Sequence, residues 1–278
     1  MTTVAWRPAT EFDIRQHVSG LGANLAGMAN IIMQLGWPQV GYGVKDSTVL
    51  DGSAMHHPVK RARTTFTFLA VALLGTDEDQ QVFRRAVNKQ HAQVRSGADS
   101  AVQYSAMDPH LQLWVAACLY YGTADLLERM GRAPQGADAD ALYAHCARFG
   151  TSLQVRPEMW PRDRAAFAEY WEQSLQAVSI DEPMRAYLTS LMRHENLPAP
   201  ATRLLGEFNT FVTTGFLPPL FRDAMGLEWD DGRQQRFDRL MRRIGRVEQR
   251  LPASVRVLPF TLLLRDMHKR QRQGRPLV

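Results

Sequence analysis

The chain has 278 residues, of which 45% are hydrophobic and 22% charged, and its formal net charge at pH 7 is +5. These proportions are those of a globular protein and argue against a disordered or fibrous chain. Its two cysteines, Cys118 and Cys146, show no Cys-x-x-Cys spacing, which disfavours a cysteine-based zinc or iron–sulfur site and favours buried free thiols.

The basic residues are mostly arginines mixed with acids, and no zinc finger, RNP-type aromatic motif or compact basic arm occurs. We therefore expect no nucleic-acid partner. The densest basic segments, residues 233–250 and 265–275, fit either a solvated helix face or contact with a membrane surface.

The beginning of the chain lacks a basic segment followed by an apolar one, so no signal peptide is expected. Residues 21–44 lie within the longest stretch without charge, but Asn, Gln, Pro and several Gly residues interrupt it. Such a composition is typical of a buried helix rather than a transmembrane segment. A cytoplasmic location is the resulting expectation.

Apolar residues recur with the period of a helix, whereas the alternating Val, Ile and Thr runs of strands are scarce. The pattern predicts helices over residues 9–19, 22–36, 58–74, 77–96, 108–130, 138–149, 162–176, 182–193, 199–212, 217–225, 231–250 and 257–271. No repeat, low-complexity tract or long linker divides the sequence. We therefore predict a single all-α domain over residues 1–278.

Several of these helices carry start and stop signals. Pro58 suits the first turn of one helix, and Gly75 suits its end. Thr76 suits the N-cap of the next helix, where the acidic run 77–79 would favour the positive helix terminus. Asp108, which a proline follows, predicts another helix start.

His91 is the first candidate for chemistry. The helix predicted over residues 77–96 places Phe83, Val87 and Val94 on the same face, so the imidazole is expected to point toward the core. A buried imidazole needs hydrogen-bond partners, or it can coordinate iron through one nitrogen. The pattern alone fits a satisfied core histidine as well as a ligand.

The preceding helix carries a stripe that begins with a cation, passes through hydroxyl groups and ends in apolar side chains. Its members are Arg61, Thr64, Thr65, Phe68 and Ala72. An arginine beside an apolar pocket suits a ligand with an apolar body and carboxylate ends. The stripe also fits a solvated arginine and a threonine bonded to its own helix.

Other common catalytic patterns are absent from the sequence. It contains no His-Glu-x-x-His or Glu-x-x-His pair, which disfavours zinc-protease and ferritin-like di-iron sites. It also lacks a Gly-x-Ser-x-Gly elbow, a Walker-type loop and a dinucleotide-binding glycine motif. The adjacent His56 and His57 side chains diverge, so they cannot easily share a metal ion.

An ordered set of motifs runs through these candidates. It comprises His57-Pro58, Arg61, Thr64-Thr65, Phe68, Gly75, His91-x-x-Val94 and Tyr104-x-Ala106-x-Asp108-Pro109-x-Leu-x-Leu-Trp114, with the Phe167-x-x-Tyr170-Trp171 and Gly215-Phe-Leu-Pro-Pro-Leu-Phe-Arg222 runs downstream. The order and spacing of these motifs resemble the MpaB-type and latex-clearing-protein family of rubber oxygenases. The resemblance covers about residues 20–265.

The resemblance implies a helical, partly globin-like core around one haem b (iron protoporphyrin IX), with His91 as the single protein ligand of the iron. It implies that Arg61 and Thr65 lie near the haem, where Arg61 would neutralise a propionate or orient dioxygen. Thr64 or Thr65 would hydrogen-bond to dioxygen. Further residues that would seat the macrocycle and an apolar substrate are Phe68, Tyr104 and Trp114.

Members of this family use dioxygen to attack isoprenoid carbon–carbon double bonds. The resemblance therefore implies a haem-dependent oxygenase, an oxidoreductase, acting on an apolar, alkene-bearing small molecule. Rubber-cleaving members carry a lysine where this chain has Thr64, beside Arg63, and Asp46 lies near the position expected for a base. Hydroxylation or dehydrogenation of a natural product is an alternative, as are a non-catalytic haem or small-molecule binding protein and a structural protein without haem.

Overall fold

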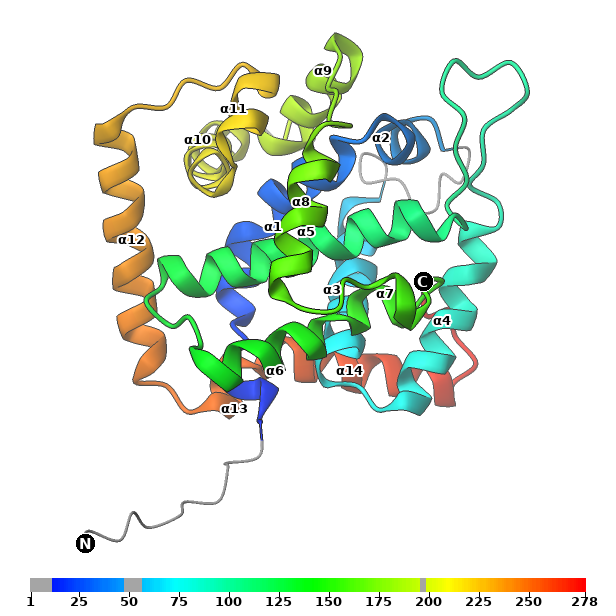
Figure 1. The fold of residues 1–278 in the computed structure, drawn as a ribbon, viewed down its shortest axis with the longest axis horizontal. Helices are drawn as coiled ribbons and strands as arrows, with labels where there is room; N and C mark the ends of the chain where they lie inside the picture. Colours follow the sequence, from blue (N-terminus) through cyan, green and yellow to red (C-terminus); the bar gives the residue numbers. More distant parts are fainter. Residues whose placement is uncertain (1–11, 48–56, 196–198) are drawn as a thin grey trace, which may run out of the picture.

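The computed structural model of the chain describes residues 12–47, 57–195 and 199–278. In these residues the chain is all-α, as predicted, and the one β-type contact is an isolated bridge between Arg95 and Ser105 (Figure 1). The elements are η1 (Ile14–Gln16), α1 (Gly20–Leu35), α2 (Pro38–Lys45), α3 (Pro58–Leu74), α4 (Asp77–His91), α5 (Pro109–Arg129), α6 (Gly136–Cys146), α7 (Arg148–Thr151), η3 (Pro157–Met159), α8 (Arg164–Leu175), α9 (Glu182–Met192), α10 (Ala199–Phe216), α11 (Pro219–Met225), α12 (Asp231–Gln249), α13 (Ala253–Arg256) and α14 (Leu258–Arg272).

The local start and stop signals are confirmed. Pro58 lies in the first turn of α3, and Gly75 is its C-cap. The Thr76 side chain accepts a hydrogen bond from the backbone N–H of Asp79, and the Asp79 carboxylate accepts one from the backbone N–H of Thr76. This reciprocal capping box fixes the start of α4. Asp108 caps α5 by accepting from the backbone N–H of His110 at 2.8 Å.

Some of the helix predictions are wrong. In the described part of the segment 9–19, only the single 3-10 turn η1 forms, because Asp13 caps Arg15 locally and a new helix starts after Ser19. The helix predicted over 77–96 ends at His91, and the backbone then turns into a loop. The short helix α2 was not predicted, since the glycines within Pro38–Lys45 weaken its helical signal.

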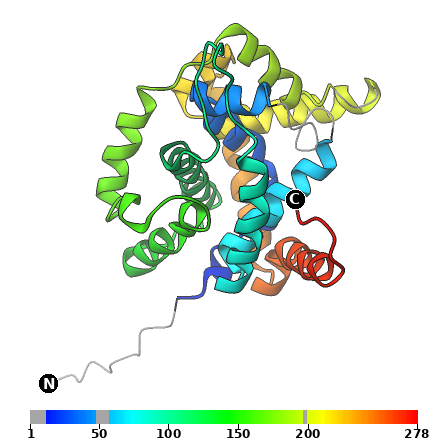
Figure 2. The same cartoon turned by 90° about the vertical axis from the view of Figure 1, so that its right-hand side faces the viewer.

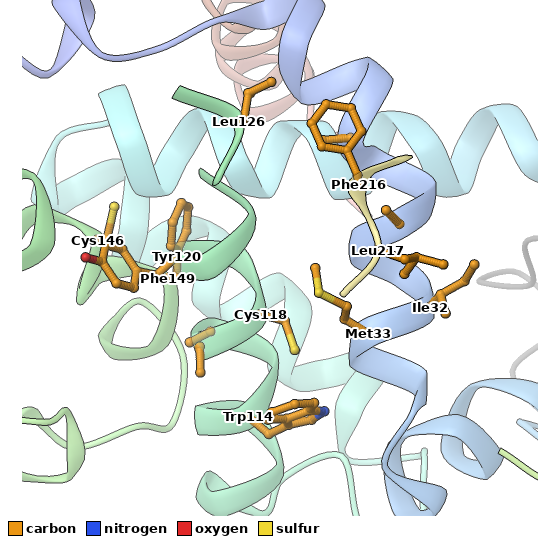
Figure 3. Close-up of a cluster of buried hydrophobic side chains, with 14 of the residues drawn as sticks. Ile32, Met33, Trp114, Cys118, Tyr120, Leu126, Cys146, Phe149, Phe216 and Leu217 are labelled. Carbon is orange, nitrogen blue, oxygen red and sulfur yellow. The ribbon is translucent and has the colours of Figure 1, made fainter. Parts of the chain in front are cut away.

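Helix α5 runs through the middle of the molecule and packs against α1, α7, α10 and α12 (Figure 1). The close-up in Figure 3 shows Trp114 and Cys118 of α5 on the same side as Ile32 and Met33 of α1. All four side chains are fully or almost fully buried, and they belong to a single cluster that takes members from Val18 to Phe260. Cys118 and Cys146 are buried free thiols, as predicted.

Helix α3 packs against α4, and the C-terminal helix α14 packs against α3 (Figure 2). A second, smaller cluster joins these three helices through Val71, Phe83, Val87 and Met267, with Leu153. This packing places the C-terminal end of α4 beside the N-terminal half of α3. In the described residues, no helix combines the length and the apolar character needed to cross a bilayer.

Candidate functional site around His91

His91 is the last residue of α4, and the face of the helix that it shares with Phe83 and Val87 is buried. Its own side chain is half-buried. The capping box at the start of α4 and the packing of Phe83 hold the helix along its length. The fold thus fixes the position of the His91 backbone while its ring keeps some accessible surface.

The surroundings of the His91 ring favour the neutral imidazole. Its Nδ1 atom is buried and meets no hydrogen-bond partner among the described residues. Burial, and secondarily the positive charge of Arg61, lower the pKa of His91 from its ordinary value of 6.5 to about 4. At neutral pH the ring therefore has a free nitrogen lone pair, which is the form that binds metal ions.

Arg61 lies in the first turn of α3 and faces the same region as His91. The residue keeps an exposed surface. Nevertheless, desolvation by surrounding protein lowers the pKa of its guanidinium group.

Tyr187 of α9 is the phenol that interacts electrostatically with Arg61, and no motif in the sequence selects it. Burial raises the pKa of Tyr187, and the charge of Arg61 opposes this shift. The tyrosine and the arginine are 126 positions apart in the chain and share no motif, so only the fold brings them together. Tyr187 is half-buried and therefore can contact a ligand beside Arg61.

The remaining predicted residues of α3 follow the expected gradient. Thr64, Thr65 and Phe68 are half-buried, and Ala72 is fully buried. The Phe68 ring lies 6.5 Å from the Phe83 ring, so it ties α3 to the helix that carries His91. The stripe thus passes from an accessible cation to the closed core over three helical turns.

Arg63 points to a different neighbour. Burial lowers the pKa of its guanidinium group, and the charged groups that act on it next are Arg270, Asp266 and Arg275, from α14 and the segment after it. Arg63 therefore faces the C-terminal helix, and Arg61 is the arginine of α3 that acts on His91.

The loop after His91 brings Tyr104 to α2. Backbone bonds from Ser96 to Tyr104 (3.0 Å) and from Ala106 to Val94 (2.9 Å) pair the two arms of this loop. The Tyr104 ring rests on α2 at Gly43, where an added Cβ would lie 3.3 Å from the ring. Glycine at position 43 thus permits the close approach.

Asp46, which lies near the position expected for a base, is close to Tyr104. It forms an exposed ion pair with Lys45 at 2.8 Å. Burial and then the charge of Asp46 raise the pKa of Tyr104. The structure therefore brings Tyr104 and Asp46 together at the end of α2.

Trp114 lies apart from this accessible group of residues. It has no exposed surface, and its ring is stacked between Trp37, at 4.9 Å, and Trp171, at 5.3 Å. Its Nε1 donates to the carbonyl oxygen of Gln34 at 3.0 Å. The structure thus places Trp114 in the closed core, where it supports α5 against α1, and direct contact with a ligand would require the stack to open.

Two other histidines have partners. His145 Nε2 lies 2.9 Å from the carbonyl oxygen of Leu73, and His268 Nε2 lies 2.6 Å from Asp79 Oδ1. Among the described residues, no three His, Cys, Asp or Glu side chains gather in a way that could hold a metal ion.

Known proteins with similar sequences identify the family. The family model described as "ER-bound oxygenase mpaB/B'/Rubber oxygenase, catalytic domain" matches residues 14–246. Two proteins described as uncharacterised, one from Mycobacterium bovis and one from Mycobacterium tuberculosis, are each 48% identical to this chain over 250 residues, which is 90% of this chain and 98% of theirs. No solved structure matches the chain. Because the family model covers most of its length, the chain belongs to the MpaB/rubber oxygenase catalytic-domain family.

Proposed function

We propose that this member of an oxygenase family is haem-dependent and uses dioxygen to oxidise an apolar, alkene-bearing small molecule. The observation that carries the proposal is the state of His91. Its ring is neutral at pH 7, half-buried, and has a buried nitrogen without a partner among the described residues. A side chain in this state is available as a ligand.

The residues present fit a haem. A porphyrin supplies four nitrogen ligands, so the protein needs to add only one, and His91 is a suitable donor. A haem also has an apolar body and two carboxylates. The half-buried Phe68 suits the body, and the desolvated cation Arg61 suits a carboxylate. When bound, the haem would supply the redox chemistry that activates dioxygen.

The protein's own task is then to orient the bound ligand and to exclude water from it. Arg61 holds a fixed positive charge near His91, and this charge favours an anionic group. Together with burial, which has the larger effect, it keeps the imidazole unprotonated. Thr64 and Thr65 present hydroxyl groups one helical turn further along α3. Tyr187 adds a phenol opposite Arg61. These groups can bind the polar end of a ligand while the apolar side chains exclude water.

The substrate is proposed to be a small molecule rather than a long polymer. Thr64 stands where rubber-cleaving relatives carry a lysine, so the site lacks that cation. An uncharged hydroxyl at this position suits a compact natural product, on which hydroxylation or dehydrogenation is the competing reaction. Ketone- or aldehyde-ended cleavage products from an isoprenoid would distinguish double-bond cleavage from this alternative.

The first test is the ultraviolet–visible spectrum of the full chain expressed with a haem precursor. We expect a Soret band that shifts after reduction with dithionite and again with carbon monoxide. His91→Ala should weaken haem binding by more than about tenfold, since losing even a group that only orients a metal ligand lowers metal affinity by at least about that factor. A colourless protein without iron would contradict the proposal.

A matched control separates ligation from folding. His268→Ala removes a histidine that already has a partner, Asp79, and should leave the Soret band unchanged. Circular dichroism should give the same helix content for both variants. If both lose the haem equally, His91 is not the ligand. A normal haem spectrum without oxygen consumption on any prenyl or aromatic alkene would instead indicate a non-catalytic haem protein.

A further inference from the structure

The outer side of α12 carries a row of exposed arginines. Residues at spacings of three and four lie on one side of a helix. The row consists of Arg236, Arg239, Arg242, Arg243, Arg246 and Arg250, all exposed. The opposite side of α12 is buried through Phe237, Met241, Gly245 and Glu248. Among the described residues, none of the six guanidinium groups has an ion-pair partner, so their charge is directed outward.

Exposed apolar side chains lie directly beside this row. A groove of about 330 Å³ runs between α12, α13 and the starts of α1 and α14. Four large apolar residues that line it are more than a third exposed: Leu21 (54%), Val247 (54%), Leu251 (39%) and Val255 (45%). Leu258 and Leu262, on the exposed side of α14, are 45% and 52% exposed.

The groove carries no free negative charge. Its one acidic residue, Glu248, accepts from Arg132 Nη1 and from Ser19 Oγ, both at 2.6 Å. Both side chains of the Arg132–Glu248 pair are 5% exposed. The cations Arg243 and Arg256 also line the groove. The groove and the arginine row together, which we call the basic–apolar face, thus present apolar and positive groups only.

We propose that the basic–apolar face docks on an anionic lipid bilayer. Leucine and valine side chains would enter the boundary between headgroups and acyl chains, and the arginines would contact lipid phosphates. The groove suits one acyl chain or the edge of a headgroup. This proposal does not depend on the haem: α12 and α4, the helix that ends at His91, lie at opposite edges of the molecule (Figure 1).

Charge and polarity favour an anionic bilayer over a second copy of the chain or a nucleic acid as the partner of this face. A second copy of the same face would bring two arginine rows together, and like charges in contact are unfavourable. A nucleic-acid backbone complements the arginines but offers nothing to the exposed leucines and valines. An anionic bilayer complements both parts of the face.

The test is flotation of the purified full chain with vesicles. One preparation contains phosphatidylcholine alone, and the other contains about one third phosphatidylglycerol. We expect binding to the anionic vesicles only, and we expect it to weaken as salt is raised. The double substitution Arg239→Ala/Arg246→Ala should lower binding at least about tenfold, because each basic residue near an anionic surface contributes about a fivefold factor. Leu251→Asp should lower it about as much.

The matched control is Arg156→Ala/Arg162→Ala. It removes the same two charges from exposed positions outside the face, next to Glu158 and Asp163. Binding should stay within about twofold of the unmodified chain. An equal loss in this variant would overturn the proposal, because net charge alone would then explain binding.

Three further results would also overturn it. The first is an unmodified chain that ignores anionic vesicles. The second is a double-stranded DNA oligonucleotide that binds more tightly than the vesicles. The third is a dimer in sedimentation that Leu251→Asp converts to a monomer, since the face would then be a contact between copies. Unchanged helix content in circular dichroism keeps every variant interpretable.

Discussion

A histidine lies at each end of α4, and the two histidines have opposite surroundings. At the start of the helix, His268 of α14 lies 2.6 Å from Asp79, whose other oxygen closes the capping box with Thr76. At the end of the helix, the buried Nδ1 atom of His91 has no partner among the described residues.

This difference separates structural from functional polar groups. A paired polar group stabilises the fold, whereas a buried nitrogen without a partner costs about 1–3 kcal/mol. Keeping such a nitrogen at a fixed position therefore lowers the free energy of unfolding. The same atom becomes favourable once a ligand or a proton partner reaches it. The start of α4 is therefore an anchor, and its end is the candidate site.

Phe83→Ala should have the largest effect, because Phe83 is a fully buried residue in the middle of α4 and belongs to the cluster that joins α4 to α3 and α14. It is 1% exposed and packs on Phe68, with 6.5 Å between the rings. Truncation of a buried phenylalanine costs about 3–5 kcal/mol. Urea denaturation of the haem-free protein should show this loss in the free energy of unfolding, while Arg85→Ala, on the exposed side of α4, should stay within about 0.5 kcal/mol. A loss below about 1 kcal/mol for Phe83→Ala would show that α4 is held by other contacts.

Much of this fold could be predicted because its signals are local. Thr76 and Asp108 cap helices through bonds to residues two or three positions away, and Pro58 needs only its own ring to start α3. The end of α4 depended on a distant pairing instead. The hydrogen bonds between Ser96 and Tyr104 draw the chain away from the helix, and the periodicity of apolar residues in the sequence does not indicate them.

The candidate site divides in the same way. His91 could be selected because Phe83 and Val87 share its helical face. Tyr187 could not, since only the packing of α9 brings it to Arg61. The accessible but desolvated state of Arg61 is likewise a property of the assembled fold. The burial of Trp114 between two other tryptophans was also not predictable from one sequence.

His91→Leu should raise the free energy of unfolding, the opposite of the change expected when a histidine with a partner is removed. In the haem-free protein this substitution removes a buried nitrogen that lacks a partner and leaves an apolar side chain of similar size. We expect an increase of about 1 kcal/mol in the free energy of unfolding. The measurement is again urea denaturation, with haem absent throughout.

The same substitution at the other histidine is the control. His268→Leu takes the partner from Asp79 and should lower the free energy of unfolding by about 1 kcal/mol. Opposite signs for the two variants would support the division between anchor and site. A loss of stability for both would mean that His91 is held by an interaction as favourable as that of His268.

Asp79→Asn gives the smallest expected effect, and pH isolates it. Burial pushes the pKa of Asp79 upward, but the hydrogen bond from His268 and the bonds from Thr76 outweigh it, so the pKa lies below its ordinary value. A carboxyl group whose pKa is lower in the folded state stabilises the fold above its unfolded-state pKa of about 4, and this contribution disappears as the pH falls through the folded-state value.

At pH 7 we therefore expect Asp79→Asn to lower the free energy of unfolding by about 1 kcal/mol. This difference from the unmodified chain should shrink as the pH falls below about 4. Asp77→Asn, at an exposed position in the same helical turn, is the matched control and should change the free energy of unfolding at pH 7 by less than about 0.5 kcal/mol. If Asp79→Asn costs the same at every pH, the carboxylate charge does not stabilise the start of α4, and the cap acts through its geometry alone.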